Sequence, residues 1–442
     1  MIINHFSTYP YGGAATAADR IHQGIRERGL DGGDVNSRFF YSINDREPPA
    51  DLSFVKLNAG PSVSKSIWQP FRKRANRRRL NKIYRLYDTH IAGRPEGLEV
   101  FSMPEQPDET AFDWNRLGGD VANLHWIAYG ADYPSFFGSI PRHVPIVWTL
   151  HDMNPFTGGC HYSGDCSRFT LGCGQCPQVV AASDDDVSRD SFEVKRKVLK
   201  DRQLTIVTPS RWLGELAKQS SILPPSTRFE TINYGLDLSQ FRPLPKQDSR
   251  EALDLGIAPD TVLIAFGAEA ISNRRKGFHH LLEALRRLST TNNVECLVFG
   301  SGEIPDDPRL PKMHQLGFIK NIRKQVEIYS AADLVVVPSR EDNQPQVGLE
   351  AMACGTPVVG FDAGGIPEYV RDGHTGLIAR LGDERHLAER ISWLIERSEA
   401  RQQMGDNALK MMRREFEMKT QTNEYLRLYR DLLQSNRVER AG

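Results

Sequence analysis

The sequence predicts an α/β protein made of two parallel-sheet domains. Its 442 residues exceed what one ordinary hydrophobic core holds and suit two domains of about 200 residues each. Short apolar runs of strand length alternate with helical stretches in two separate series, which is the pattern of parallel α/β domains. A turn-rich stretch at residues 233–246, NYGLDLSQFRPLPK, separates the two series and predicts a hinge linker between the domains.

The expected strands are apolar runs bounded by turn residues. In the first domain, residues 1–232, they are Ile2–Phe6, Ser37–Tyr41, Val121–Ile127, Ile146–Leu150 and Thr205–Thr208. In the second domain, residues 247–415, they include Val262–Phe266, Glu295–Phe299, Leu334–Pro338 and Pro357–Phe361. Helices rich in Arg, Glu, Leu and Met then run from Asp383 to Ser435.

Charge and hydropathy exclude two classes of protein. Lysine plus arginine equals aspartate plus glutamate at 56 each, so the chain as a whole is not an electrostatic nucleic-acid binder. No apolar run approaches the roughly 20 residues that a helix needs to cross a bilayer. The N-terminal MIINHFSTYPYGG leads into an expected strand rather than a charged and then apolar leader, so we expect a cytoplasmic protein without a nucleic-acid partner.

Two carboxylates surround an expected helix start in the second domain. The helix Val347–Cys354 follows a Gln-Pro-Gln turn, and a helix start offers unpaired N–H groups and partial positive charge to an anion. A diphosphate is therefore expected near Gln346, Val347 and Gly348, with Glu350 accepting hydrogen bonds from ribose hydroxyls. Asp342, eight residues before Glu350, is placed to reach the transferred sugar. The alternative is that both carboxylates are solvated surface acids.

This segment resembles the signature of retaining glycosyltransferases of the GT-B fold, and within them the colanic-acid and exopolysaccharide-type transferases of bacteria. The family pattern is an acid, seven residues and a Glu, followed by EAMACGTPVV and GG-x-x-E. The chain matches it with Asp342 beside Glu341, then Glu350, residues 351–359, Gly364, Gly365 and Glu368. The linker also resembles the family's PNGVD-x-x-x-F-x-P, with Tyr234 in place of Asn.

The resemblance implies two Rossmann-like domains facing each other across a cleft, with a final helix, residues 416–442, returning to the first domain. It implies an acceptor site on residues 1–232 and a nucleotide-sugar site on residues 247–415. The implied activity is hexosyl transfer with retention, from a nucleotide-sugar donor to a glycan or lipid-linked glycan acceptor in surface polysaccharide assembly. No cofactor is required for such catalysis, because cations and a helix start replace a divalent ion.

Cations follow the strand Val262–Phe266. Lys276 and Arg275 precede an amphipathic helix, where a cation is unfavourable unless an anion is bound, so we expect them to neutralise the departing nucleoside diphosphate. The family usually has Gly-Arg at this strand end, whereas the chain has Gly267-Ala268, and Arg274 or Arg275 is expected to substitute.

Further candidates follow other strands. Gly12 and Gly13 allow close backbone approach to a phosphate or acceptor, or simply form a tight turn. Phe318, after Gly317, resembles the family's base-flanking turn. His151 corresponds to a family histidine that contacts the donor sugar, and a structural histidine is the alternative. Gly300-Ser301-Gly302 lacks G-x-G-x-x-G and a following helix, which excludes a nicotinamide dehydrogenase.

An insert at residues 154–178 holds four cysteines within seventeen positions: Cys160, Cys166, Cys173 and Cys176. Disulfides are disfavoured in a reducing cytosol, and Cys173-x-x-Cys176 has the ligand spacing of a zinc ribbon. A structural zinc is therefore expected, with His161 as an alternate ligand. Reduced thiols or a disulfide pair are the alternatives.

A basic segment between Lys65 and Arg85 contains nine basic residues and no acid, interleaved with apolar residues that include Ile67, Trp68, Phe71 and Ile83. This pattern is typical of a segment that lies on an anionic membrane surface, and a solvated helix face or an RNA-contacting patch are the alternatives. We therefore expect a peripheral association with the inner face of the cell membrane.

Two rival functions stay open at this point. One is a GT-B sugar-nucleotide epimerase. The other is a catalytically degenerate GT-B scaffold, which Ala268 and the Asp at position 342 suggest.

Overall fold

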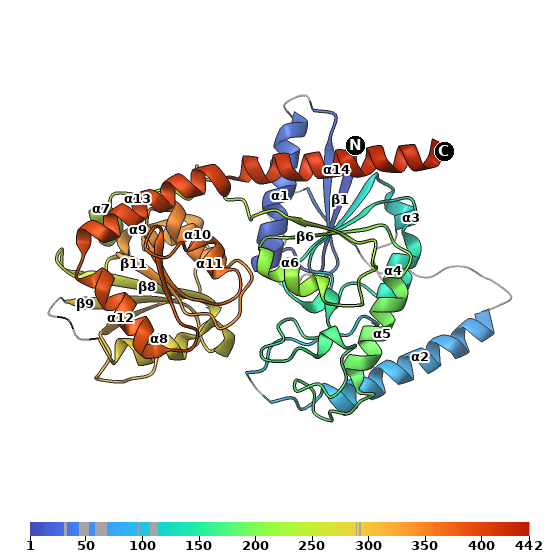
Figure 1. Cartoon of the computed structure of the whole chain (residues 1–442), viewed down its shortest axis with the longest axis horizontal. Helices are drawn as coiled ribbons and strands as arrows, with labels where there is room; N and C mark the ends of the chain where they lie inside the picture. Colours follow the sequence, from blue (N-terminus) through green and yellow to red (C-terminus); the bar gives the residue numbers. More distant parts are fainter. Residues whose placement is uncertain are drawn as a thin grey trace. The chain divides into compact units, whose positions relative to one another are not determined.

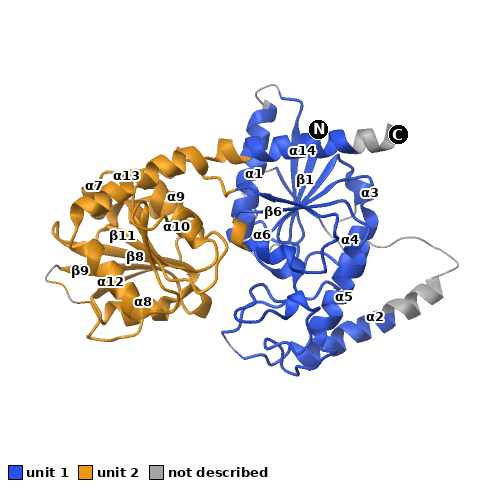
Figure 2. Ribbon diagram, in the orientation of Figure 1, with its two compact units in different colours: residues 1–209, 213–232, 422–442 blue, residues 210–212, 233–421 orange. Residues whose placement is uncertain are grey.

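The computed structural model describes residues 1–30, 33–43, 53–57, 69–95, 97–106, 114–288, 290 and 293–441, and it divides the chain into two compact units (Figure 2). Unit 1 comprises Met1–Pro209, Leu213–Ile232 and Thr422–Gly442. Unit 2 comprises Ser210–Trp212 and Asn233–Gln421. Each unit is built on its own parallel sheet, which confirms the predicted fold class.

Unit 1 contains a seven-stranded parallel sheet in the order β3-β2-β1-β4-β5-β6-β7 (Figure 1). Its strands are β1 Ile2–Ser7, β2 Asn36–Tyr41, β3 Phe54–Lys56, β4 Val121–Leu124, β5 Ile146–Thr149, β6 Leu204–Thr208 and β7 Arg228–Thr231. The inner strands are buried along their length, as expected for a parallel sheet covered on both faces.

The helices of unit 1 are α1 Gly13–Leu30, α2 Gln69–His90, α3 Trp114–Leu117, α4 Tyr133–Ser139 and α5 Val187–Leu199, while α6 Arg211–Lys218 begins in unit 2. Helices α1 and α4 cover opposite faces of the sheet, whereas α2 packs against α5. Ile21 and Ile25 of α1 share one apolar cluster with Ile3, Val121 and Val147 of the strands. On the opposite face, Phe136 and Phe137 of α4 pack edge-on or tilted against Phe6 and Trp148.

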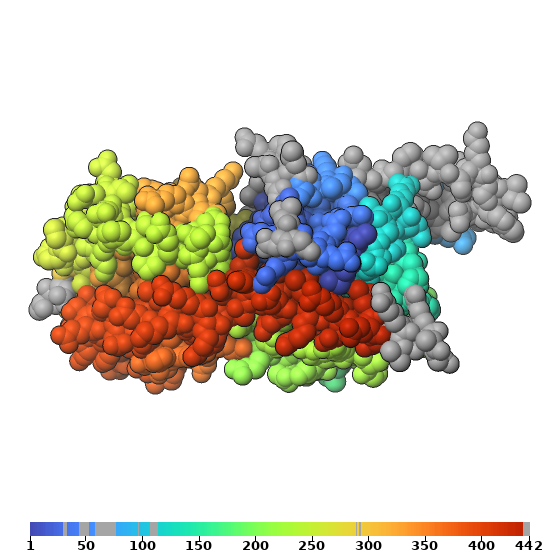
Figure 3. Space-filling view, turned by 90° about the horizontal axis from the view of Figure 1, so that it is seen from above, coloured from blue at the N-terminus to red at the C-terminus, as the bar shows by residue number. Residues whose placement is uncertain are grey.

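The last helix, α14 Met418–Ala441, packs beside α1 on the first of these faces (Figure 3). Its contacts with the sheet are polar as well as apolar. Tyr425 Oη lies 3.0 Å from Thr149 Oγ1, and Asn123 donates to Tyr429 Oη at 2.8 Å. Gly24 of α1 leaves room for Thr422, because a Cβ there would lie 2.0 Å from the threonine hydroxyl.

Unit 2 contains a six-stranded parallel sheet in the order β10-β9-β8-β11-β12-β13. Its strands are β8 Val262–Ala270, β9 Val294–Ser301, β10 Lys312–Gly317, β11 Leu334–Val337, β12 Val358–Phe361 and β13 Gly376–Ala379. Its helices are α7 Lys246–Leu253, α8 Phe278–Leu285, α9 Ile322–Ala331, α10 Gln346–Ala353, α11 Ile366–Tyr369, α12 Glu384–Ile395 and α13 Ser398–Glu415. The buried Arg250 of α7 joins Asp333, at 2.9 Å, just before β11 begins.

The expected strands are present, and the differences are a shorter central strand β4 and edge strands that were not predicted. The strand expected at Val121–Ile127 ends at Leu124, because Trp126 leaves the sheet and its indole donates to Asp152 at 2.8 Å. The edge strands β3 and β7 were not predicted, since their partly exposed residues carry no continuous apolar run. None of the helices in the described part of the chain is long and apolar enough to cross a membrane.

Candidate functional site

The loop after β11 leads into the helix start at which the sequence predicts a bound anion. Helix α10 begins at Gln346, and Pro345 at its cap position provides no side-chain hydrogen bond. A Cβ on Gly348 would lie 2.3 Å from Tyr369 Oη, so the glycine admits this hydroxyl to the first turn. Tyr369 is buried, and its hydroxyl has no hydrogen-bond partner among the described residues. A helix start without a side-chain cap favours an anion through its partial positive charge. A buried hydroxyl without a hydrogen-bond partner beside it can donate to the same anion.

Asp342 is the centre of a charged cluster beside this helix start. Its carboxylate accepts from Lys276 Nζ at 2.6 Å and from Ser339 Oγ at 3.2 Å, and it lies 3.3 Å from Arg275 Nη1. Burial raises the pKa of Asp342, but the charges of Lys276 and Arg275 lower it more, so the net direction is down. From its position before a helix, Lys276 was predicted to lie near an anion. In the structure, the Asp342 carboxylate is that anion.

The two cations reach Asp342 from a short turn, Arg274–Lys276, that follows β8. Arg275 also donates to Glu341 O at 2.9 Å, which fixes its guanidinium against the loop. Of the two arginines that were expected to replace the family's arginine, Arg275 joins the cluster, whereas Arg274 is exposed. Ala268 itself is 8% exposed in the core of the unit.

Glu350 lies on the second turn of α10 and is buried. Its Oε2 accepts from Tyr329 Oη at 2.9 Å, so the carboxylate is held by a tyrosine of α9. Tyr329 was not predicted, because nothing in the sequence marks its packing against α10. Phe318 follows β10, is 46% exposed and lies at the outer edge of the sheet.

Other acids and amides of the signature hold the loop in place. Glu368 accepts from the backbone N–H groups of Arg211 and Trp212, each at 2.9 Å, at the start of α6. Gln344 Oε1 accepts from Tyr234 N at 2.9 Å, so the Tyr that replaces the family's Asn contributes its backbone to the loop. These contacts explain why residues on both sides of Asp342 are polar yet buried.

In unit 1, three histidines form a line across the carboxyl ends of neighbouring strands. His5 Nδ1 lies 3.0 Å from His125 Nε2, and His125 Nδ1 lies 3.1 Å from His151 Nε2. Burial lowers the pKa of His151 to about 4, against an opposing effect of Asp152, and it lowers the pKa of the other two well below the usual value. His151 is therefore a neutral imidazole at pH 7. The sequence identified His151 but not His5 or His125.

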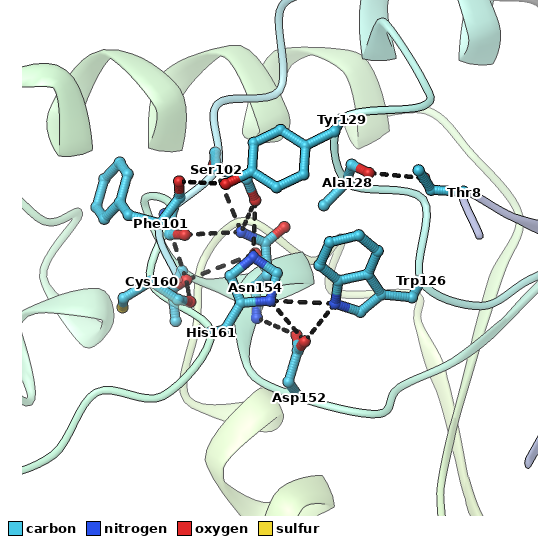
Figure 4. A network of polar contacts seen from close by, with 12 residues as sticks. Thr8, Phe101, Ser102, Trp126, Ala128, Tyr129, Asp152, Asn154, Cys160 and His161 are labelled. Atoms are coloured by element: carbon cyan, nitrogen blue, oxygen red, sulfur yellow. Dashed lines mark hydrogen bonds and ion pairs between the residues drawn. The ribbon is translucent and has the colours of Figure 1, made fainter. Parts of the chain in front are cut away.

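A second polar network lies beside this line (Figure 4). Asp152 Oδ2 accepts from Trp126 Nε1 at 2.8 Å and lies 2.6 Å from His161 Nδ1. The other nitrogen of His161 lies 2.8 Å from Ser102 Oγ. Both ring nitrogens of His161 are thus engaged, so its expected role as an alternate zinc ligand does not fit this arrangement.

The turn before α1 has the backbone that was expected of it. Gly12 has a φ of +89°, in the region that favours glycine, and no atom lies within 4 Å of the position of a Cβ. Helix α1 begins at Gly13. The glycine pair therefore makes the turn and leaves open space beside the helix start.

The four cysteines of the insert are free thiols, with Cys173 and Cys176 buried. Gly158 N donates to Cys173 Sγ at 3.3 Å, and burial raises the pKa of Cys173 to about 11 despite this hydrogen bond. No group of three or more His, Cys, Asp or Glu side chains in the described ranges is positioned to hold a metal ion. Zinc binding stays a prediction.

The basic segment is partly a structural helix. Lys65, Ile67 and Trp68 lie outside the described residues, and no side-chain position is described for Phe71. Arg79 of α2 forms an ion pair with Asp132, the N-cap residue of α4, and Lys82 donates to Asp190 at 2.7 Å.

Three side chains of α2 therefore differ from the interfacial interpretation. Ile83 is 4% exposed and faces the core, so it cannot bury its side chain in a membrane. Arg79 and Lys82 are engaged by carboxylates of unit 1. Arg77 and Arg78 are exposed and stay available to an anionic surface.

Comparisons with known proteins assign one segment of the chain to a family model and give related proteins. Residues 260–411 match the family model described as glycosyl transferases group 1. The chain is 29% identical over 334 residues to D-inositol 3-phosphate glycosyltransferase of Mycobacterium sp. (strain KMS), covering 70% of this chain and 68% of that protein. The corresponding protein of Catenulispora acidiphila is 28% identical over 345 residues, covering 73% and 77%.

Solved structures share the fold at low identity. Sucrose-phosphate synthase from Thermosynechococcus elongatus has a TM-score of 0.66 and 17% identity, over 98% of this chain and 99% of that chain. HepE from Anabaena, solved in complex with UDP-glucose, has a TM-score of 0.62 and 16% identity, over 98% and 100%. Residues 260–411 therefore form a glycosyl transferases group 1 domain, and the chain is a glycosyltransferase with the GT-B fold.

Proposed function

We propose that the protein transfers a hexose, with retention of configuration, from a nucleotide-sugar donor to a glycan or lipid-linked glycan acceptor in surface polysaccharide assembly. The observation that carries the donor half of the proposal is the cluster of Lys276, Arg275 and Asp342 beside the uncapped start of α10. It is also consistent with the similar HepE structure that holds UDP-glucose.

The donor is proposed to bind unit 2 through its diphosphate. The N–H groups at the start of α10 and the Tyr369 hydroxyl offer hydrogen bonds to phosphate oxygens, and Glu350 is proposed to accept from the ribose. Lys276 and Arg275 neutralise the charge that grows on the leaving phosphate as the glycosidic bond breaks. In this proposal these cations do the work that a divalent metal does in other transferases, so catalysis requires no cofactor.

Asp342 is proposed to position the two cations, because its carboxylate already accepts hydrogen bonds from Lys276 and Ser339. Its reach to sugar hydroxyls, which the sequence suggested, then requires that a bound donor draw the cations away. The two roles of Asp342 can be distinguished by removing its charge. If the carboxylate only positions the cations, a bound donor should stabilise the variant more than the parent; if it contacts the donor, a bound donor should stabilise the variant less.

His151 is proposed to orient a sugar hydroxyl as a neutral hydrogen-bonding group. Its low pKa keeps the ring uncharged at neutral pH, and its Nε2 is directed to His125. For a retaining reaction by front-face attack, the leaving phosphate takes the proton of the acceptor hydroxyl while the new bond forms. No protein base is then needed in the transfer step.

The test is turnover of Lys276→Ala, with Arg274→Ala as the matched control from the same turn. Loss of one charge-stabilising donor should lower kcat roughly a hundredfold while the fold is retained. Arg274 is exposed, so its alanine variant should keep near-normal turnover. Near-normal turnover by Lys276→Ala, with a large loss for Arg274→Ala, assigns the role to Arg274 and overturns the proposed cluster.

A further inference from the structure

Four aromatic rings gather on two loops at the carboxyl edge of the unit 1 sheet. They are Tyr9 and Tyr11, which follow β1, and Trp126 and Tyr129, which follow β4. Ring centroids lie 5.2 Å apart for Tyr9 and Tyr11, 5.7 Å for Tyr9 and Trp126, and 5.8 Å for Trp126 and Tyr129. We call these four residues the aromatic platform. None of its members is fully buried, and Tyr129 is 40% exposed.

Hydrogen bonds at their polar ends hold two of these rings (Figure 4). Trp126 Nε1 donates to Asp152 Oδ2 at 2.8 Å, and Tyr129 Oη donates to Phe101 O at 3.0 Å. The two loops are also joined, because Thr8 N donates to Trp126 O at 2.7 Å. The rings are therefore fixed in direction before any ligand arrives, and little side-chain entropy is lost when one binds.

The backbone of Tyr129 is strained. Its φ of +64° lies in the left-handed region, which is unfavourable for a bulky residue. An exposed ring on a strained backbone contributes little to the stability of the folded state. A buried ring on a relaxed backbone would contribute more. Strained residues of this kind concentrate at ligand sites.

The platform lies next to the groups already assigned to the sugar. Trp126 directly follows His125, whose ring lies 3.1 Å from His151, and the Trp126 indole is hydrogen-bonded to the neighbour of His151, Asp152. The Gly12 turn follows Tyr11 immediately, and it is open where a Cβ would stand. A sugar ring on the platform therefore has polar side chains along one side and an open backbone turn near another.

We propose that the aromatic platform binds a pyranose ring of the acceptor by stacking. The axial C–H groups on one face of a pyranoside are apolar and slightly positive, and they match the negative face of an aromatic ring. The hydroxyls around the ring edge then reach the hydrogen-bonding groups near His151. This inference rests on the proposed function, whose acceptor it narrows to a glycan with one unsubstituted apolar face.

Local charge favours a neutral ring over a phosphorylated polyol. Asp152 accepts a hydrogen bond from Trp126 of the platform; burial raises its pKa, but the neighbouring His161 and hydrogen bonds lower it further, so it is ionised at neutral pH. Arg94, which is near Tyr129, donates to the backbone carbonyls of Gln178 and Glu99 at 2.6 Å each. A phosphate on the platform thus gains no free cation from Arg94 and lies near the negative charge of the buried Asp152.

Saturation-transfer NMR tests the stacking directly. The probes are methyl β-D-galactopyranoside, methyl β-D-glucopyranoside and myo-inositol 1-phosphate, and the proteins are the full chain and its variants Tyr129→Phe, Tyr129→Leu and Tyr11→Leu. Saturation should be strongest at the axial ring hydrogens of a pyranoside. Tyr129→Phe keeps the ring but loses the hydrogen bond to Phe101 O, so it should bind more tightly than Tyr129→Leu, and each leucine variant should weaken binding about three- to tenfold relative to the parent.

Trp393→Ala is the matched control, because Trp393 is 36% exposed in unit 2 and outside the platform. It should leave pyranoside binding unchanged. The proposal is overturned if the folded leucine variants bind pyranosides as well as the parent, if no pyranoside binds the parent, or if myo-inositol 1-phosphate binds more tightly than either pyranoside.

Binding of UDP, GDP and ADP to the same proteins distinguishes a failure of the aromatic platform from a failure of the proposed nucleotide-sugar donor. The leucine variants should keep nucleoside diphosphate binding, since the platform and α10 belong to different units. Pyranoside binding without any nucleoside diphosphate binding supports the platform and refutes the proposed donor. Nucleoside diphosphate binding with no pyranoside binding refutes the platform alone.

Discussion

Replacing Asp342 with Asn removes one negative charge from the cluster and keeps the shape of the side chain. In the parent, the carboxylate lies 2.6 Å from Lys276 Nζ and 3.3 Å from Arg275 Nη1. Without it, the two cations face each other with no counter-charge, and their repulsion acts in a partly buried site. The folded state of the variant should therefore be destabilised.

The magnitude follows from burial. Breaking a buried ion pair by removing one partner costs about 3–5 kcal/mol. The side chains of Lys276 and Arg275 are 27% and 13% exposed, so solvent screens part of the loss. We expect a loss of about 2 kcal/mol. For a unit of this size that loss lowers Tm by about 4–8 °C.

The destabilisation should depend on pH in one direction. Burial raises the pKa of Asp342, but Lys276 and Arg275 lower it further, so its folded-state pKa is below the unfolded value of about 3.9. Its stabilising contribution is present above the unfolded pKa and is lost as pH falls through the folded pKa. The Tm difference between parent and variant should be full at pH 7 and shrink as pH falls below about 4.

The assay is thermal unfolding with and without UDP, GDP or ADP. A bound diphosphate restores the negative charge that the variant lacks, so the ligand should raise Tm more in Asp342→Asn than in the parent. Glu389→Gln is the control, since its exposed pair with Arg385 in the same unit should contribute little. A smaller ligand shift in Asp342→Asn would mean that the carboxylate contacts the ligand itself, and an unchanged Tm would mean that it does not hold the cations.

Three further predictions follow from the site and from α2. Glu350→Ala should weaken nucleoside diphosphate binding about 10- to 100-fold in calorimetry, because ribose hydroxyls lose a charged acceptor worth about 1.5–3 kcal/mol, and unchanged affinity removes Glu350 from the site. The double variant Arg77→Glu, Arg78→Glu should co-sediment less with anionic vesicles and should keep its fold. Arg79→Glu should instead destabilise the protein, because it places a second acid beside Asp132. Equal vesicle binding by the parent and the double variant refutes a membrane role for α2. Metal analysis of untagged protein should find about one zinc per chain if the four thiols are drawn together by the ion, and four titratable thiols without metal contradict that prediction.

The fold was predictable where burial leaves a mark on the sequence. The central strands of both sheets are covered on both faces, so each appears as a short apolar run between turns. The edge strands β3 and β7 were not predicted, because an edge strand is partly solvated and its residues are mixed. The strand predicted at Val121–Ile127 ends early for a different reason. The chain leaves the sheet at Trp126, and this depends on a contact with Asp152, which is distant in sequence.

The grouping of the candidate site residues was predictable where a residue sits within a local signature. Asp342, Glu350 and Lys276 were identified from their spacing to strand ends and a helix start, and the structure joins Lys276 to Asp342. Tyr329 and Tyr369 were missed because their roles arise from packing between helices. A signal for Tyr369 existed in Gly348, whose missing side chain makes room for the tyrosine hydroxyl. The pairing of Arg79 with Asp132 had no such signal, because the sequence does not show which of several arginines faces the protein.

The central claim is that unit 2 holds the diphosphate of an activated sugar between Lys276 and the start of α10. Calorimetric titration of the parent and of Lys276→Ala with UDP, GDP and ADP tests it most directly. One of the three should bind the parent saturably, and Lys276→Ala should bind it at least about tenfold more weakly, since a charge-assisted hydrogen bond contributes about 1.5–3 kcal/mol. Absence of binding by all three nucleotides, or equal affinity in parent and variant, would contradict the account.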